Sequence, residues 1–400
     1  MEPFLGRLIS IIMSNASCKF CPILSVYEWK QGHEWRRHQI SAHELKAKRE
    51  DDSLQIISED TQVYIIIASA NVIRRCQPCR QDISNAFHIP ETWWTNYYRK
   101  SNGYFGCGAT RDAQGILTGF NAWAFFETKH LALNLQYHWT KINVFTRWLS
   151  STNQTGVLVF DPNEHFPRPL LDLRPMTSHL NDPLWVYVKV LNEVSCLQES
   201  AVWATRDQIR AIEKQTNPPG RPQPDYRRLH DIARHTVHVT ESLDVSIQNL
   251  GHILSNHARH MNRTFPSLLG TRQDPDVWQD IHAELTASKS YLDSLKLRSI
   301  SNEKRLQNEI QLAFNTVAQH DAAITVEISK AMRADSSTIT TLTADSGWSV
   351  SGKIWIYWAF AIPTAIGTAL LWNYWHRIFP HSEVEQLRRL KMDIPMQDRP

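Results

Sequence analysis

The sequence predicts an α+β, mostly α protein: an N-terminal α/β domain, long antiparallel helices with a stalk helix, and one C-terminal transmembrane helix. Three observations support this fold class. Two short β-branched apolar runs are typical of buried strands, long stretches carry apolar residues every three or four positions, and residues 354–375 include no formal charge. A mean hydropathy of -0.39 argues against a protein with many membrane spans.

Residues 1–60 are predicted to form a poorly specified N-terminal arm. Their composition is mixed, and charged side chains dominate residues 46–52. The apolar run at residues 8–13 follows Arg7 and has no positive leading region, so we expect no cleaved signal peptide.

An α/β cytoplasmic domain is predicted for residues 61–215. The runs TQVYIIIA (61–68) and GVLVF (156–160) are nearly continuous in apolar residues, as in strands buried on both faces. The aromatic-rich stretch between them is expected to supply core side chains, because large rings bury the most area. Residues 184–213 have a helical pattern, and strands set among helices indicate the α/β class.

A Pro-rich linker (216–228) and a long-helix stalk region (229–345) follow. Residues 229–257 place a mostly apolar stripe on one side of a long helix. A second helix, from about residue 276 to 334, contains no proline and would be roughly 90 Å long. An ordinary bundle helix is the alternative, but this length, just before the uncharged segment, favours a stalk.

The segment 354–375 is predicted to cross a membrane once. As a helix it spans roughly 33 Å, close to the hydrocarbon thickness of a bilayer. A buried core helix is the alternative, which Pro363 and Gly367 disfavour because membrane helices tolerate both residues better. Aromatic rings at the two ends are the predicted membrane-interface anchors: Trp355, Tyr357, Trp358, Trp372, Tyr374 and Trp375. Residues 376–400 form a basic C-terminal tail.

Cysteines and histidines raise the question of a metal site. Cys18/Cys21 and Cys76/Cys79 both have CxxC spacing, which four-thiolate zinc sites and redox motifs share. The pairs lie much farther apart than in a zinc ribbon, so ordinary reduced thiols are favoured. Six histidines share one helical region, and their spacing favours solvated helix surface over a ligand cluster: His230, His235, His238, His252, His257 and His260. No metal ligand is nominated, and no resident cofactor is expected.

The composition and the motifs also indicate which classes of function are not expected. A net charge of +3, from 43 basic and 40 acidic residues, gives no field suited to nucleic acid. The sequence contains no P-loop, GxSxG, HExxH or dinucleotide-binding fingerprint. We therefore expect neither an enzyme nor a nucleic-acid-binding protein, and membrane lipid is the first expected partner.

Six strings carry a family resemblance: WTNYYRKSNGYFGC (94–107), FTRWLS (145–150), VLVFDP (157–162), DYRRLHDIARHTVHVTESLDV (225–245), RLQNEIQLAFNTVAQHD (305–321) and IWIYWAFAIP (354–363). They resemble the CorA-like magnesium transporter family, in particular its divergent fungal branch. The resemblance covers about residues 85–376. It implies a homo-oligomer, typically a pentamer, with a cytoplasmic funnel, stalk helices and transported Mg²⁺.

The sequence departs from this family at the pore. The family has a first, pore-lining membrane helix followed by a Gly-Met-Asn signature, and the sequence contains neither; His260-Met261-Asn262 is the nearest spelling and lies upstream. Residues 335–353 include Asp345, Gly347 and several hydroxyl residues, which could not cross lipid. The helix is missing from the protein or from the gene model. The basic tail would prefer the cytosolic side, which suits a two-helix ancestor better than a single-span chain.

Two functions follow from the resemblance and the departure. The first is a CorA-like divalent-cation (magnesium) transporter-like membrane protein, impaired or non-conducting alone. The alternative is a single-span, membrane-anchored regulatory or interaction subunit that co-assembles as a hetero-oligomer with full-length relatives. The sequence does not indicate which membrane the protein occupies.

Overall fold

The structure is a computed structural model that describes residues 21–46, 54–95, 100–132, 136–162, 166–172, 174–215, 221–268, 275–337, 340–342, 348–350 and 354–378. The chain divides into two units, Met1–Phe314 and Asn315–Pro400. Each unit is described by itself. Of the features predicted from the sequence, Cys18 and the C-terminal tail after residue 378 lie outside the described residues.

A seven-stranded sheet organises the first unit, in the order β2-β1-β3-β7-β6-β5-β4. Its strands are β1 (Ile23–Trp29), β2 (Arg36–Ser41), β3 (Val63–Ala68), β4 (Gly103–Arg111), β5 (Leu117–Leu131), β6 (Tyr137–Leu149) and β7 (Thr155–Phe160). Neighbouring strands are antiparallel except β3 and β7, which run parallel with Val63 opposite Thr155. The central pair is therefore made of the two apolar runs that the sequence singled out.

Both faces of this central pair are buried, as the continuous apolar pattern predicts. Val63 and Ile65 of β3 belong to one core cluster, whereas Tyr64 and Ile66 belong to the cluster on the opposite face. Successive side chains of a strand point to opposite faces, so a strand covered on both sides needs apolar residues at every position. The predicted strands at 61–68 and 156–160 are confirmed.

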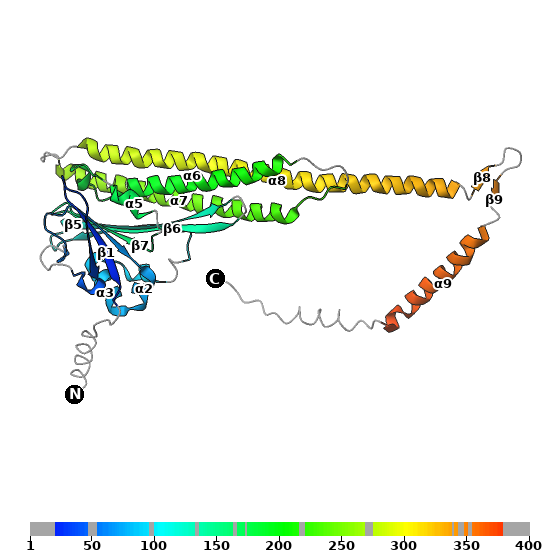
Figure 1. Cartoon of the computed structure of the whole chain (residues 1–400), viewed down its shortest axis with the longest axis horizontal. Helices are drawn as coiled ribbons and strands as arrows, with labels where there is room; N and C mark the ends of the chain where they lie inside the picture. The colour runs from blue at the N-terminus through cyan, green and yellow to red at the C-terminus, as the bar shows by residue number, and fades with distance from the viewer. Residues whose placement is uncertain are drawn as a thin grey trace, which may run out of the picture. The chain divides into compact units, whose positions relative to one another are not determined.

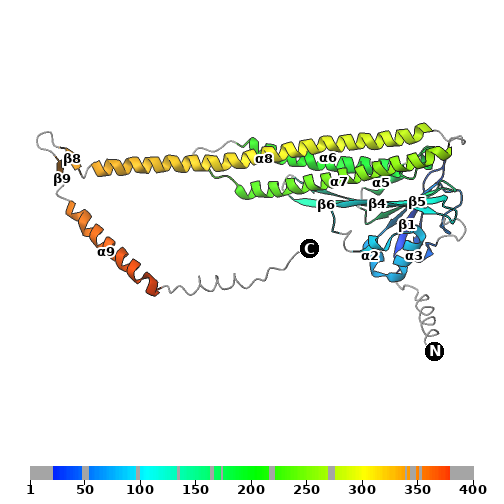
Figure 2. The same cartoon turned by 180° about the vertical axis from the view of Figure 1, so that it is seen from behind.

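Helices cover the two faces of the sheet (Figures 1 and 2). The first face packs against α2 (Ala70–Arg75), α3 (Gln77–Phe87) and the short 3₁₀ turns η1 (Ala42–Glu44) and η2 (Glu91–Trp94). The second packs against the η3 turn (His179–Asn181), α5 (Pro167–Leu171), α6 (Val186–Glu213), α7 (Tyr226–Leu268) and the first part of α8 (Pro275–Ser337). Helices on both sides of a mixed sheet make this unit an α/β domain extended by long helices.

The three long helices pack through the apolar stripes that the sequence predicts. Leu243 and Leu250 of α7 are fully buried, as are Leu285 and Leu292 of α8. The carboxyl of Asp225 accepts a hydrogen bond from the backbone N–H of Arg228 at 2.9 Å, which satisfies one of the unpaired donors at the start of α7. Periodicity and this cap together explain why α7 begins at Tyr226.

A bidentate ion pair joins α6 to α8 farther along. Arg305 donates from Nε and Nη2 to the two carboxyl oxygens of Glu213, at 2.8 and 2.5 Å. The paired guanidinium lowers the pKa of Glu213. Parallel N–H···O bonds fix the relative register of the two helices as well as attracting them.

The second unit contains the rest of α8, the strands β8 (Thr340–Leu342) and β9 (Trp348–Val350), and α9 (Ile354–Ile378). The predicted fold class is confirmed: a sheet domain, long helices, and one apolar helix near the C-terminus. The other five strands of the large sheet were not predicted: β4, β5 and β6 lie in the stretch expected only to supply aromatic core side chains, and β1 and β2 lie within the residues assigned to an N-terminal arm.

Candidate functional site

The apolar helix α9 is the first candidate functional element. Among the described residues it is the one helix long and apolar enough to cross a membrane, judged by length and composition, over Ile354–Tyr374 with a hydropathy of 1.6. None of that stretch is buried against the rest of the protein. A helix with large apolar side chains on every side and no protein cover suits a lipid environment.

The predicted interface anchors lie at the two ends of α9. Trp355, Tyr357 and Trp358 stand in its first turns, and Trp372 and Tyr374 near its end, all with exposed side chains. The side chain of Trp375 lies outside the described set. The Tyr357 and Trp358 rings contact each other edge-on, with centroids 5.4 Å apart. Their role at a membrane interface stays a prediction.

The two threonine hydroxyls of α9 form hydrogen bonds within the helix. The Thr364 hydroxyl donates to the carbonyl oxygens of Phe360 at 2.8 Å and Ala361 at 3.0 Å. Thr368 bonds in the same way to Thr364 and Ala365. Such back-bonding lets hydroxyl residues sit in hydrocarbon without an outside partner, which a membrane helix requires.

The connection between α8 and α9 is the place where the family resemblance implies a pore-lining helix. Its described residues instead form the antiparallel pair β8–β9, with Thr340 opposite Val350 and Leu342 opposite Trp348. Two three-residue strands cannot cross a bilayer, because a spanning strand needs about 9–11 residues in a closed barrel. This connection therefore offers no second span among its described residues.

A buried Asp–His–His network is the second candidate. Asp182 precedes α6, and its Oδ2 lies 2.6 Å from Nε2 of His257 on α7. Nδ1 of His257 lies 3.0 Å from Nδ1 of His282 on α8, and the two rings stack. Asp182 and His257 are each 1% exposed. If the His257 ring donates from Nε2 to Asp182 and accepts at Nδ1 from His282, both of its ring nitrogens have a hydrogen-bond partner.

This network corrects the prediction of a solvated histidine face. His257 and His235 are buried and His260 is half-buried, whereas His230 and His252 are exposed as predicted. Burial lowers the pKa of both His260 and His282. The hydrogen bonds of the network join the turn before α6 to α7 and α8, so its geometry holds three elements together.

A cavity of about 650 Å³ lies beside the network, between the sheet and the α7–α8 pair. Its lining includes Arg111, Arg259 and the His260 ring, which stacks on Trp278 with centroids 5.4 Å apart. No carboxylate is among the described lining residues. A lining with positive charge and no acidic oxygen does not suit a divalent cation, which prefers carboxylate and carbonyl ligands.

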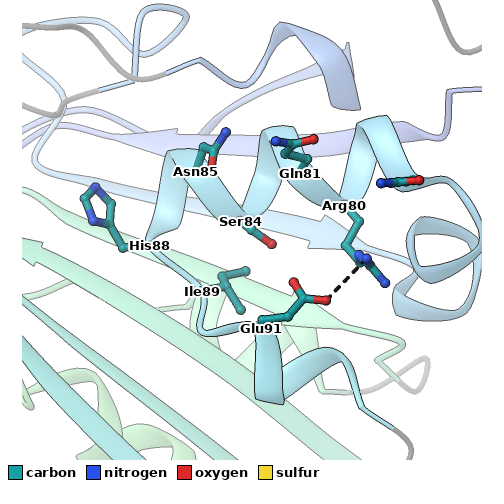
Figure 3. Close-up of a pocket in the computed structure, with 8 residues that line it drawn as sticks. Arg80, Gln81, Ser84, Asn85, His88, Ile89 and Glu91 are labelled. Carbon is teal, nitrogen blue, oxygen red and sulfur yellow. Dashed lines mark ion pairs between the residues drawn. The ribbon is translucent and has the colours of Figure 1, made fainter. Parts of the chain in front are cut away.

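A second cavity, of about 600 Å³, lies along α3 and the turn that follows it (Figure 3). Gln81 and Asn85 project from α3, and Arg80 pairs with Glu91 at 3.3 Å. The Ser84 hydroxyl accepts a hydrogen bond from the Trp94 indole at 2.7 Å. Because the two charges pair with each other, the cavity mainly offers amide groups, which suit a polar contact surface.

The spacing of the cysteines in the sequence is compatible with either a zinc site or ordinary reduced thiols. Within the described ranges, no group of three or more His, Cys, Asp or Glu side chains is arranged to hold a metal ion. The structure nevertheless brings the two CxxC motifs together, since the Sγ atoms of Cys21 and Cys79 lie 3.3 Å apart. Their separation in sequence hid this contact, and the repeated CxxC spacing was the one signal that pointed to it.

Comparisons with known proteins give distant matches. No protein-family model matches the chain. It is 25% identical over 289 residues to "Notoamide biosynthesis cluster protein M'" of Aspergillus versicolor, over 61% of each chain. The chain thus spans about three fifths of the length of this curated relative.

Three solved structures show likenesses of fold. Full-length CmaX matches with a TM-score of 0.43 and 13% identity, over 91% of this chain and 99% of that one. The ZntB cytoplasmic domain from Vibrio parahaemolyticus gives 0.38 and 6%, over 73% and 99%. The CorA magnesium transporter from Methanocaldococcus jannaschii gives 0.37 and 9%, over 88% and 87%.

Proposed function

We propose that the chain is a CorA-like membrane protein related to divalent-cation transport, with Mg²⁺ as the cargo, and that it does not conduct alone. The observation that carries this proposal is the order of its elements. An α/β sheet domain and long packed helices precede the 63-residue α8, and one uncovered apolar helix, α9, follows. The six strings that resemble the family fall within these same elements.

Oligomerisation is part of the proposal. In the second half of α8, Ile324 and Ile328 are 40% and 54% exposed, and Phe314 upstream is 57% exposed. Together with Val317 they follow one another at intervals of three, seven and four residues, which places them on one side of a helix. The Phe314 ring stacks on Tyr226, but much of the stripe is exposed. An exposed apolar stripe is suited to pack against the same stripe of other subunits.

The second candidate is a membrane-anchored regulatory subunit that joins full-length relatives. It is favoured by the β8–β9 pair, which occupies the connection where a pore-lining helix would lie, and by the lack of a Gly-Met-Asn triplet in the sequence. The one candidate span among the described residues supplies no filter for a hydrated cation. Such a chain would act through the pores of its partners.

Uptake of Mg²⁺ tests both candidates in cells whose own transporters have been removed. We expect no uptake when the chain is expressed alone, and an altered rate when it is expressed with a two-span relative. Uptake by the chain alone would refute the non-conducting proposal. An unchanged rate in the mixture, with both proteins present in the membrane, would refute the regulatory role.

A further inference from the structure

Three cysteines from two distant CxxC motifs lie close together on the face of the sheet that packs against α2 and α3. Cys21 directly precedes the β1 region, while Cys76 and Cys79 lie at the start of α3. The Cys21 and Cys79 Sγ atoms are 3.3 Å apart, and the Cys76 side chain is a further hydrogen-bonding neighbour of Cys79. Cys79 is fully buried, whereas Cys21 and Cys76 are half-buried.

Backbone hydrogen bonds hold both sides of this contact. The carbonyl of Pro22, next to Cys21, accepts from the N–H of Ala42 at 3.2 Å. The Cys76 N–H donates to Ile73 and its carbonyl accepts from Arg80, each at 3.0 Å, so Cys76 ends α2 and caps α3. Because both segments are fixed, the two thiols are held close to each other by the fold.

We propose that Cys21 and Cys79 are a thiol-oxidation site, which hydroperoxides convert into a disulfide between the lead-in to β1 and the first turn of α3. A disulfide needs sulfur atoms about 2 Å apart, so the two sulfurs must approach by little more than 1 Å. Cys76 provides a neighbouring third thiol that can exchange with the bridge. The pair is a site in its own right and does not rest on the proposed transport function.

The chemistry divides between an accessible and a buried thiol. The sulfur of half-buried Cys21 attacks a peroxide oxygen; an S–O bond forms, the O–O bond breaks, and sulfenic acid and water result. The sulfur of Cys79 then attacks the sulfenic sulfur; the S–S bond forms, the S–O bond breaks, and the departing hydroxide takes the Cys79 proton as water. Two thiols are oxidised and one hydrogen peroxide is reduced to two waters.

The difference in burial between Cys21 and Cys79 indicates which thiol reacts with peroxide and which then attacks the sulfenic acid. Burial, and the neighbouring thiols of Cys21 and Cys76, raise the pKa of Cys79. A thiol with a raised pKa is a poor first target for peroxide, which reacts with thiolates, so Cys79 resolves rather than initiates. Cys107 and Cys196, the other described cysteines, have no thiol contact of this kind and serve as internal controls.

Peptide mapping of the full-length chain in detergent tests the site. The reduced protein is treated with hydrogen peroxide and digested without reductant. We expect a Cys21–Cys79 cross-linked peptide, the loss of two titratable thiols, and a rise of about 5 °C in the unfolding midpoint because the bridge closes a long loop. Dithiothreitol should reverse all three changes.

Matched variants separate the site from general oxidation. The double variant Cys107→Ser, Cys196→Ser should form the bridge as readily as the parent chain. Cys21→Ser should abolish it, and because Cys21 is half-buried this variant is expected to keep the fold, as circular dichroism checks. Cys76→Ser should retain the Cys21–Cys79 bridge.

Three outcomes would overturn the proposal. Peroxide could leave Cys21 and Cys79 titratable, or it could oxidise Cys107 or Cys196 first. The chain purified under reducing conditions could also contain one equivalent of zinc that is absent from Cys21→Ser, in which case the thiols form a metal site instead.

Discussion

At the scale of single residues, the contact between Asp182 and His257 joins elements that are far apart in sequence. It links the turn before α6 to the C-terminal third of α7, and His282 extends it to α8. Asp182 and His257 are shielded from bulk water, and His282 is half-buried. A polar network in such a place stabilises one helix arrangement only while every member has its partner.

Replacing Asp182 with alanine is expected to lower the free energy of unfolding by about 3 kcal/mol, because the buried His257 ring then loses its acceptor. Urea unfolding of the detergent-solubilised chain, followed by tryptophan fluorescence, measures this. His252→Ala, on the exposed face of the same helix, should change the value by less than about 0.5 kcal/mol. Equal effects of the two variants would contradict a structural role for the network.

His235 is expected to make the protein less stable in acid. Burial, then the nearby Lys129 and Arg234 charges, lowers its pKa from 6.5 to about 4, while Asp231 opposes this and His238 adds to it. The unfolded chain therefore takes up a proton first as the pH falls. The stability that His235 contributes is complete above pH 6.5 and is lost between about pH 6.5 and 4.

The measurement is the free energy of unfolding as a function of pH, between pH 7 and pH 4.5. His235→Asn should flatten the acid slope by up to about 1.4 kcal/mol per pH unit, the value for one proton. His230→Asn, at an exposed position on the same helix, should leave the slope unchanged. A slope that survives His235→Asn would assign the acid sensitivity to other groups.

These residue-scale features were beyond what the sequence could predict. Asp182 lies just before the helical pattern of residues 184–213, and nothing in its local sequence indicates a histidine 75 positions away as its partner. The helical spacing did place the histidines on α7, but which of them face the sheet depends on how α7 docks. Tertiary packing, which one-dimensional patterns do not encode, decided their burial.

At the scale of elements, α9 carries the membrane interpretation. Arginine at Ile366, midway along the helix, should disfavour insertion by about 2.5–3.5 kcal/mol. We expect a clear fall in the fraction of Ile366→Arg that resists alkaline carbonate extraction. Val237→Arg, at an exposed position of α7, is the matched control and should stay as resistant as the parent chain. Resistance of Ile366→Arg equal to that of the control would argue against a spanning role.

The elements predicted correctly are those whose periodicity is strong. The strands β3 and β7 are apolar at nearly every position, and the helices α6, α7 and α8 repeat apolar residues with helical spacing. The strand β2, RRHQIS, lies at the edge of the sheet and has only one buried residue, so no hydrophobic pattern marks it. The long hairpin of β5 and β6 supplies the aromatic core that was predicted, but the density of rings obscured the strand alternation.

At the scale of the whole molecule, we propose that copies of the chain associate through the exposed apolar stripe on α8. Glutamate at both Ile324 and Ile328 should reduce the oligomer measured by chemical cross-linking in membranes, because it places charge on the apolar side of the helix. Gln319→Glu introduces the same side chain away from that stripe and should leave cross-linking unchanged. Loss of cross-linking in both, or in neither, would contradict assembly through this stripe.

The parallel pairing of β3 with β7 has a consequence for synthesis of the chain. The two strands are about 90 residues apart, so the centre of the sheet depends on non-local contacts, which form slowly. During translation β1, β2 and β3 leave the ribosome first. The edge of β3 that pairs with β7 then stays unpaired until β7 has also left the ribosome. We infer that ribosomal stalling between these strands exposes an apolar strand edge, which makes this interval the period in which nascent chains most need a chaperone.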